Sequence, residues 1–269
     1  MIILMTDFVR SDDTDINKTD RFSQSTCFKF KSFHSSDCTL TTTRVDIWQY
    51  PLHTLWSGAK ALLNQAETER AERYYFHRHQ RRFTVARAML RLILSRYLKN
   101  TKPHELEFNE NSYGKPQLSP SNEDLQFNLS HSGDLALLAI GQQHALGIDL
   151  EFFAGRAYTG IGSHLFSSSE NAGLNQVIPS LKPLSFFHIW AQKEAFIKAC
   201  GLGLSYPTQQ FDVPYLPVTD QTVHDILHNT SWHITSFMPK IGCSAAICHH
   251  PTVHDIRYLS LDSHRDLIK

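Results

Sequence analysis

The segment from Gln80 to Lys99 constrains the fold most strongly, because its apolar residues recur at the spacing of one helix face. This stripe consists of Phe83, Ala86, Leu90, Ile93, Leu94 and Tyr97. A second helical pattern, SFFHIWAQKEAFIKACG, follows Pro183 and can end in a left-handed cap at Gly201 or Gly203. Strand-like runs, LQFNLSHSGDLALLAI and ALGIDLEFF, lie between the two helical patterns. Because helix and strand signals interleave, we predict an α+β (α/β) fold.

The rest of the chain divides into a polar leader and further short elements. Residues 1–43 are rich in Ser, Thr and Asp and lack sustained periodicity, so we expect a mobile leader. VDIWQYPL predicts the first strand, and a helical pattern extends from about Leu52 to Asn64. NSYGKPQLSPSNED carries turn signals, while SWHITSFM and CSAAIC are typical of strands.

Bulk composition excludes several classes of protein. The chain has 26 basic and 26 acidic residues, a balance that requires neither nucleic acid nor an anionic membrane as a partner. No apolar stretch approaches the length of a membrane span, and MIILM is too short for a signal-peptide core. The 5 cysteines are an odd number at scattered spacings, which favours a reducing, cytoplasmic location. A zinc site at Cys243 and Cys248 is disfavoured, because positions five apart on a strand face opposite ways.

The short run GIDLE places two carboxylates, Asp149 and Glu151, on one face of a predicted strand. Ile148 and Leu150 then occupy the other face. Like charges at this spacing repel unless one is protonated or a cation lies between them. The run therefore indicates either a half-buried strand with an acidic wet face or a cation site.

The second helix offers another carboxylate. Glu194 projects about 40° from the buried Trp190, and Lys198 lies four residues further on the same side. Alone, the two form an ordinary helix-surface pair worth roughly 0.2–0.5 kcal/mol. Together with Asp149 and Glu151, however, Glu194 supplies a third oxygen ligand for a hard divalent cation such as Mg²⁺. Cationic groups suited to a polyphosphate accompany these acids, namely Lys198, Lys115, His131 and an arginine of the Gln80–Lys99 helix.

Four motifs carry a family resemblance: GKP, FNLSHSG, GIDLE and WAQKEAFIKACGLGL. In this order and at these separations they resemble the 4'-phosphopantetheinyl transferases of the surfactin-synthetase type. FSSSE at 166–170 also matches the Phe-Ser-x-x-Glu stretch of that family. The resemblance covers roughly residues 44–250 and leaves the leader outside.

The resemblance implies a reaction and its metal. Members of this family move the phosphopantetheine arm of coenzyme A onto a serine of an apo acyl or peptidyl carrier protein and release 3',5'-ADP. Carried over, Asp149, Glu151 and Glu194 would hold Mg²⁺, or Mn²⁺, against the pyrophosphate of coenzyme A. Lys198 would contact the same pyrophosphate and assist departure of the leaving group. Glu194, directly or through a water, would take the proton from the attacking serine.

Further residues would bind the nucleotide. Lys115 and Pro116 match the segment that lines the adenine and phosphate region, and Ser130 and His131 match residues at the 3'-phosphate end. Basic residues of the first half usually meet the 3'-phosphate too. The matching positions here are Arg82 and Arg87, with Arg78 as an alternative. The other reading of this basic cluster is a solvated face. Lys193 belongs to the motif but points about 100° away from Glu194, so it ranks below Lys198.

The resemblance also implies an architecture. Two similar α/β halves, 44–143 and 144–262, would pack about a pseudo-twofold axis with coenzyme A in the cleft between them, followed by a tail at 263–269. Exposed apolar residues near the cleft would receive the carrier, whose recognition helix is typically acidic. Between Glu67 and Lys99 there are eight arginines and one lysine against three glutamates, an excess that would steer such a partner. One chain supplies both halves, so we expect a monomer.

Two rival functions compete with this interpretation. A catalytically idle relative would bind coenzyme A or a carrier without transfer, yet every metal and lysine position of the motifs is present. A nucleic-acid-binding protein would use the arginines of 70–99 and show strongly salt-dependent affinity. That reading leaves the three acids unexplained, and the sequence does not name the carrier.

Overall fold

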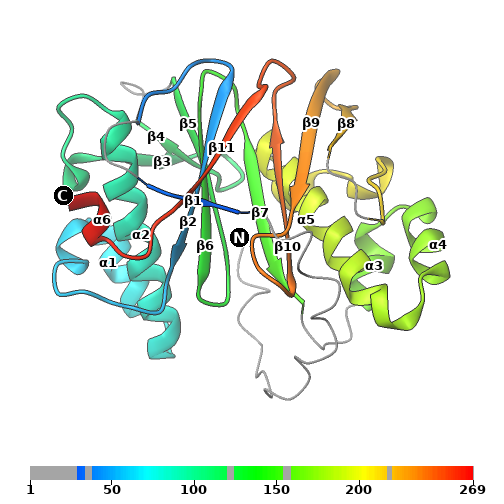
Figure 1. The fold of residues 1–269 in the computed structure, drawn as a ribbon, viewed down its shortest axis with the longest axis horizontal. Coiled ribbons are helices and arrows are strands. Elements are labelled where there is room, and N and C mark those ends of the chain that lie inside the picture. Colours follow the sequence, from blue (N-terminus) through cyan, green and yellow to red (C-terminus); the bar gives the residue numbers. More distant parts are fainter. Residues whose placement is uncertain (1–28, 34–37, 120–123, 154–158, 217–219, 269) are drawn as a thin grey trace.

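The computed structural model describes residues 29–33, 38–119, 124–153, 159–216 and 220–268, which form two lobes (Figure 1). The first sheet has the order β1-β11-β2-β6-β5, with strands Lys31–Ser32, Asp255–Ser260, Arg44–Pro51, Leu135–Gln142 and Leu125–Ser132. The second has the order β7-β10-β9-β8, with strands Gly147–Phe152, Cys243–His249, Thr230–Phe237 and Asp220–Asp225. A small ribbon pairs β3 (Phe108–Glu110) with β4 (Pro116–Leu118).

One long helix covers the outer face of the first sheet. This helix, α2 (His77–Tyr97), contains the predicted apolar stripe, and Leu90, Ile93 and Leu94 are completely buried in the core that it shares with the sheet. The shorter α1 (Gln65–Glu72) packs against it. The predicted helix over 80–99 is thus confirmed, with a start three residues earlier than expected.

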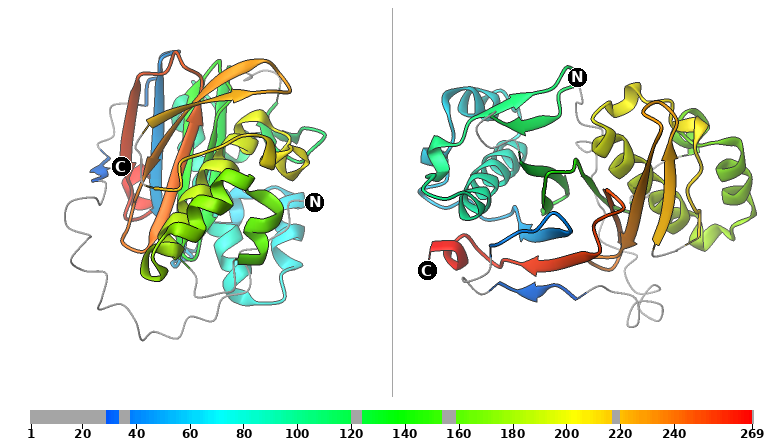
Figure 2. Two further views of the ribbon diagram at one scale, coloured as in Figure 1. Left: turned by 90° about the vertical axis from the view of Figure 1, so that its right-hand side faces the viewer. Right: turned by 90° about the horizontal axis from the view of Figure 1, so that it is seen from above.

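The second sheet is covered by α5 (Lys182–Cys200), which confirms the second predicted helix. Pro183 lies in its first turn, where the missing N–H costs nothing, and Gly201 ends it in the left-handed region with φ 76°. Two shorter helices, α3 (Thr159–Leu165) and α4 (Ser168–Gln176), precede it. Figure 2 shows α2 and α5 on opposite sides of the molecule, with the strands of both sheets between them.

The two lobes share a hydrophobic core made by the sheet faces that lack a helix. Val45, Ile47 and Leu137 from the first sheet pack there with Ile148 and Leu150 of β7. The lobes are also joined where β5 runs beside β7, because amides of β7 donate to side-chain oxygens of β5 instead of to its backbone. A mixed fold of two lobes, each with a long helix on a sheet, agrees with the predicted class.

The lobes are not simple consecutive halves of the chain. β11 returns from the second lobe to pair in parallel with β2, and α6 (Arg265–Ile268) places Leu267 in the core of the first lobe. These elements lie within the ranges expected to be the second half and a tail. β1 pairs in parallel with β11, although it lies inside the expected leader. The first sheet therefore begins before VDIWQYPL; residues 1–28 and 34–37 of the leader lie outside the described residues.

One helix prediction is wrong. Between Leu52 and Asn64 the structure has only the single turn Lys60–Leu62. The helix instead begins after Asn64, whose side chain accepts a hydrogen bond from the Glu67 amide while the Glu67 carboxylate accepts one from the Asn64 amide. This reciprocal capping sets the boundary, because it satisfies the otherwise unpaired donors of the first turn.

Two further observations concern other sequence expectations. Cys243 and Cys248 lie on opposite sides of β10, one in the core between the lobes and the other in the core beneath α5. Their thiols therefore do not converge on one metal. Among the helices in the described ranges, none is long and apolar enough to cross a membrane.

Candidate active site

The two acids of GIDLE lie on the face of β7 opposite the core between the lobes, as alternation predicts. Ile148 and Leu150 are buried in that core, whereas Asp149 and Glu151 face α5 and the polar side chains of β5. Asp149 is only 2% exposed. The wet-face reading of this strand therefore does not describe Asp149, because its carboxylate is buried.

Two serines and a tryptophan hold these carboxylates. Ser130 Oγ donates to Asp149 Oδ1 at 2.9 Å, and Ser132 Oγ donates to Glu151 Oε2 at 3.3 Å. Trp190 Nε1 donates to the other oxygen of Glu151 at 3.1 Å. Sequence analysis included Ser130 as a nucleotide contact and Trp190 as part of a buried stripe, and it missed Ser132. The recurrence of serine at alternate positions of one strand was the available signal.

Helix α5 brings Glu194 and Lys198 to the same place. Lys198 Nζ lies 2.5 Å from Asp149 Oδ1 and 4.0 Å from Glu194 Oε2. Close approach of helix and strand depends on Gly147, where a Cβ would lie 2.1 Å from the carbonyl oxygen of Ala195. The glycine of GIDLE is therefore required for packing, and the packing brings the Lys198 ammonium beside two of the predicted carboxylates, Asp149 and Glu194.

Burial and mutual repulsion perturb the ionisation of this cluster. Burial, reinforced by Asp149, raises the pKa of Glu151 to about 8. Burial also raises the pKa of Glu194 to about 7; Lys198 opposes that shift and Asp149 adds to it. For Lys198, burial lowers the pKa, but the carboxylates of Asp149 and Glu194 together outweigh burial and raise it. The cluster thus contains more carboxylates than one lysine can keep ionised, and additional positive charge would stabilise their ionised forms.

The donor atoms suit a hard divalent cation. Asp149 Oδ2 is buried and has no hydrogen-bond partner among the described residues, and a buried carboxylate oxygen without a partner is costly. Three carboxylates supply the oxygen ligands that Mg²⁺ prefers. Within the described ranges, no three Asp, Glu, His or Cys side chains are already gathered closely enough to hold a metal. The residues fit such an ion in chemistry, with the Lys198 ammonium lying between Asp149 and Glu194.

The arginines of α2 fall into two groups. Arg81 and Arg82 both bind Asp134, at 3.1 and 2.8 Å. Asp134 comes two residues after Ser132, so Arg82 lies near the end of β5 that carries the site. Arg87, further along α2, instead pairs at 2.6 Å with Glu67 of α1. The structure therefore brings Arg82 toward the site but commits Arg87 to α1.

Buried contacts define the role of Arg87 and its neighbour. Arg91 is completely buried, and its Nη2 lies 2.8 Å from the same Glu67 carboxylate. Both guanidinium groups lie over the Phe108 ring, at 4.7 and 5.0 Å from its centroid. Burial lowers the pKa of Arg87, and the Glu67 carboxylate opposes that shift. Arg78 lies outside this group and stacks over Phe76 at 4.9 Å.

Two further predicted residues, His131 and Lys115, lie on β5 and directly before β4. Alternation along β5 places His131 on the face opposite Ser130, on the side of α2. Lys115 Nζ donates to the carbonyls of Leu146 and Ala199, at 3.0 and 3.3 Å, close to the C-terminus of α5. Burial lowers the pKa of Lys115 to about 8. Its ammonium thus links the GKP turn to the last turn of α5.

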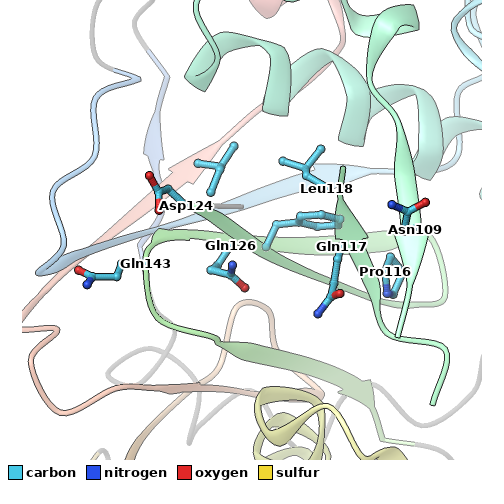
Figure 3. Close-up of a pocket in the computed structure, with 9 residues that line it drawn as sticks. Asn109, Pro116, Gln117, Leu118, Asp124, Gln126 and Gln143 are labelled. Atoms are coloured by element: carbon cyan, nitrogen blue, oxygen red, sulfur yellow. The ribbon is translucent and has the colours of Figure 1, made fainter. Parts of the chain in front are cut away.

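Pro116 lines a pocket of about 480 Å³ between the β3-β4 ribbon and the start of β5 (Figure 3). The lining consists of Asn109, Pro116, Gln117, Leu118, Asp124, Leu125, Gln126, Phe127 and Gln143. Figure 3 shows Gln117 and Gln126 on the side away from Leu118. Gln126 shares its face of β5 with Ser130 by alternation, so the pocket and the acidic site border the same strand face.

Lys193, the other lysine of the KEA helix, faces away from the acids. Lys193 Nζ lies 2.9 Å from Glu170 Oε2 and donates to the carbonyls of Thr208 and Phe211. Glu170 ends the FSSSE motif and caps α4 together with Ser167. The motif therefore ties α4 to α5, a role that sequence analysis did not identify.

Comparisons with known proteins identify a family for this chain. Residues 47–143 match the family model described as 4'-phosphopantetheinyl transferase, N-terminal, and residues 145–248 match the 4'-phosphopantetheinyl transferase superfamily. 4'-Phosphopantetheinyl transferase HetI of Nostoc sp. is 33% identical over 215 residues, which cover 78% of this chain and 89% of that protein.

Two further relatives are more distant. 4'-Phosphopantetheinyl transferase Sfp of Bacillus subtilis is 31% identical over 153 residues, 57% of this chain and 66% of its own. L-aminoadipate-semialdehyde dehydrogenase-phosphopantetheinyl transferase of Homo sapiens is 28% identical over 179 residues, 62% of this chain and 58% of its own. The motifs, the two-lobed fold and these similarities together show that the chain belongs to the 4'-phosphopantetheinyl transferase family, enzymes that transfer phosphopantetheine from coenzyme A to carrier proteins.

Proposed function

We propose that transfer by this protein depends on Mg²⁺ held by Asp149, Glu151 and Glu194 against the pyrophosphate of coenzyme A. The observation that carries the proposal is the buried oxygen Asp149 Oδ2, which lacks a partner among the described residues. When bound, the ion would offset negative charge on the pyrophosphate as 3',5'-ADP leaves. Mn²⁺ accepts the same oxygen donors and would serve as a substitute.

Lys198 and Glu194 would be the side chains that act directly on the phosphate and on the attacking serine. Lys198 contacts Asp149 and lies 20% exposed, so its ammonium can turn toward a phosphate at the surface of the cluster. Glu194 is 16% exposed and would take a proton from the attacking serine, directly or through a water.

The remaining predicted contacts would bind the nucleotide. His131 and Arg82 lie on the α2 side of β5, where together they would meet the 3'-phosphate. Pro116 and the amides of the pocket beside it suit the uncharged adenine. Lys115 would act by holding this turn against α5, since its ammonium binds backbone carbonyls. Arg87 supports the first lobe from its pair with Glu67.

The carrier protein would approach the turn between α1 and α2. Tyr75 is 91% exposed and Phe76 is 51% exposed, and Arg73 and Arg78 flank them. Large exposed apolar side chains rimmed by positive charge fit an acidic amphipathic helix. We propose that a single chain in the cytoplasm is the working unit, because one chain supplies both lobes. The Cys200 thiol, which donates to Asp225 without forming a disulfide, suits a reducing compartment.

Intact-mass spectrometry of apo carrier proteins tests the proposal. Each carrier is incubated with the protein, coenzyme A and Mg²⁺, and in parallel with EDTA. We expect a mass gain of one phosphopantetheine that is lost with EDTA and restored by excess Mg²⁺. Equal transfer with and without EDTA would contradict the metal role. Binding of coenzyme A without transfer to any carrier would support a catalytically idle relative instead.

A further inference from the structure

Ser130 and Ser132, two residues apart on β5, each make one hydrogen bond to a backbone amide of β7 and one to a carboxylate of β7. Ser130 Oγ accepts a hydrogen bond from the Leu150 amide at 3.3 Å and donates to Asp149 Oδ1 at 2.9 Å. A hydroxyl has one hydrogen to donate, so this hydrogen is committed to the carboxylate. Lys198 Nζ, at 3.4 Å, approaches the same oxygen. The side chain is buried and fully engaged within the fold.

Ser132 repeats this pattern at the second acid. Its Oγ accepts from the Phe152 amide at 3.2 Å and donates to Glu151 Oε2 at 3.3 Å. Trp190 holds the other oxygen of Glu151 from α5. Each oxygen of an ionised carboxylate can accept about two hydrogen bonds or ligands, so one partner on each leaves Glu151 able to bind a cation.

Asn128 shows that the pattern is a property of the whole β5-β7 contact. Its Oδ1 accepts from the Ile148 amide at 2.8 Å. The amides of β7 that face the first lobe are thus satisfied by alternate side chains of β5. Each serine of β5 binds a backbone amide of β7 and also the neighbouring carboxylate of β7. These two bonds hold the carboxylate in a fixed orientation relative to the β7 backbone.

We propose that Ser130 and Ser132 are positioning residues that hold Asp149 and Glu151 in the orientation in which they bind a divalent cation. The inference rests on the proposed metal role of these acids and deepens it. Ser130 occupies Asp149 Oδ1 and leaves Oδ2 without a partner in the described structure. Ser132 and Trp190 similarly fix both oxygens of Glu151. Hydrogen-bond partners behind metal ligands typically contribute 10- to 100-fold to metal affinity.

The test replaces Ser132, which contacts Glu151 but, in the described structure, not Lys198. A substitution there therefore reports on the carboxylate without disturbing the lysine. Ser132→Ala removes the hydroxyl, and Ser132→Thr restores it. Ser236→Ala is the matched control, because Ser236 is also buried in a sheet but its Oγ has no hydrogen-bond partner among the described residues. Binding of Mn²⁺ alone and with coenzyme A is followed by loss of the free-ion electron paramagnetic resonance signal. Urea unfolding in EDTA reports the fold of each variant.

We expect Ser132→Ala to weaken Mn²⁺ binding by about 10- to 100-fold, and Ser132→Thr and Ser236→Ala to bind like the wild type. In turnover assays, Ser132→Ala should need more Mg²⁺ for half-maximal rate but approach the wild-type kcat when Mg²⁺ saturates. Unchanged Mn²⁺ affinity in Ser132→Ala would overturn the inference, whether or not urea stability falls. If the wild type itself bound no Mn²⁺, the proposed function would fail; normal binding in both proteins would defeat only the positioning role.

Discussion

Two lysines of one helix, Lys193 and Lys198, have opposite surroundings. The Lys193 side chain is 3% exposed and lies 2.9 Å from Glu170 Oε2. Its remaining donors reach the carbonyls of Thr208 and Phe211, at 2.6 and 2.8 Å. Glu170 is the directly paired carboxylate, Asp212 adds a weaker negative charge, and each hydrogen of the ammonium has an acceptor. This is a structural ion pair that joins three segments of the second lobe.

The surroundings of Lys198 are unbalanced by comparison. Asp149, Glu151 and Glu194 all act on a single ammonium, and one oxygen of Asp149 lacks a partner in the described structure. The pKa values of Glu151 and Glu194 rise to about 8 and about 7 because burial and neighbouring negative charge disfavour ionisation. From this difference we expect Lys193, whose donors are all paired, to serve stability, and Lys198, beside a carboxylate oxygen without a partner in the described structure, to serve binding.

The largest expected effect follows from removing one acid of the unbalanced cluster. Glu194→Gln keeps the shape of the side chain but removes a proposed metal ligand, so kcat should fall about a thousandfold, as expected for the loss of several kcal/mol of charge stabilisation. Stability in urea should stay within about 1 kcal/mol of the wild type, because the substitution also relieves repulsion with Asp149. Full activity in this variant would refute the metal assignment.

Breaking the balanced pair should affect stability instead. Lys193→Met leaves Glu170 buried without its cation, so the free energy of unfolding should drop by about 3–5 kcal/mol. Adding Glu170→Gln removes the uncompensated charge, and stability should recover in part in the double variant. Urea denaturation of both variants checks this, and a Lys193→Met protein as stable as the wild type would show that the pair contributes little.

Another titratable side chain of α5, His188, is buried, and its Nε2 has no hydrogen-bond partner among the described residues. Burial lowers its pKa to about 4, and a backbone hydrogen bond involving Leu216 only partly opposes this. The unfolded chain therefore binds the proton first, and stability falls as the pH drops from about 6.5 to about 4. The loss amounts to up to about 3 kcal/mol. His188→Phe should lack this contribution, and unfolding measured at pH 7.5 and 4.5 for both proteins would show whether the two slopes differ.

Mg²⁺ should stabilise the protein most when the acidic cluster is intact. At a concentration about 100 times its Kd, a ligand that binds only the folded state adds about 2.7 kcal/mol. We expect Tm to rise when Mg²⁺ and coenzyme A are added together, and to return on addition of EDTA. Glu194→Gln should gain less than the wild type does. Equal gains in both proteins would place the ion elsewhere.

Periodicity explains what the sequence could predict. The stripes on α2 and α5 repeat at helical spacing, and alternation in GIDLE placed Asp149 and Glu151 on one face of β7. Both patterns are local, so they survive in any fold that buries them. Glu194 and Lys198 followed because they lie one turn apart on α5.

Contacts between segments far apart in the chain explain what the sequence could not predict. The family resemblance made Arg87 a candidate for phosphate binding. Its pairing with Glu67 could not be predicted, because Glu67 lies in α1, outside the helix expected over 52–64. The role of Ser132 depends on β5 lying beside β7, and that of Lys193 on the loop that carries Phe211. The return of β11 to the first sheet is likewise nonlocal. No local pattern specifies such pairings.

The most direct test compares Lys193→Met with Lys198→Met by intact-mass assay of carrier modification, with each rate divided by the folded fraction at that temperature. Lys193→Met should transfer phosphopantetheine within a few-fold of the wild-type rate per folded molecule. That ratio corresponds to a change of about 1 kcal/mol or less in activation free energy. Lys198→Met also leaves a buried carboxylate, Asp149, without its cation and should lose stability. Unlike Lys193→Met, it should in addition lose most of its transfer rate per folded molecule. The reverse pattern, with an active Lys198→Met and an inactive but folded Lys193→Met, would contradict the division of roles between these two lysines.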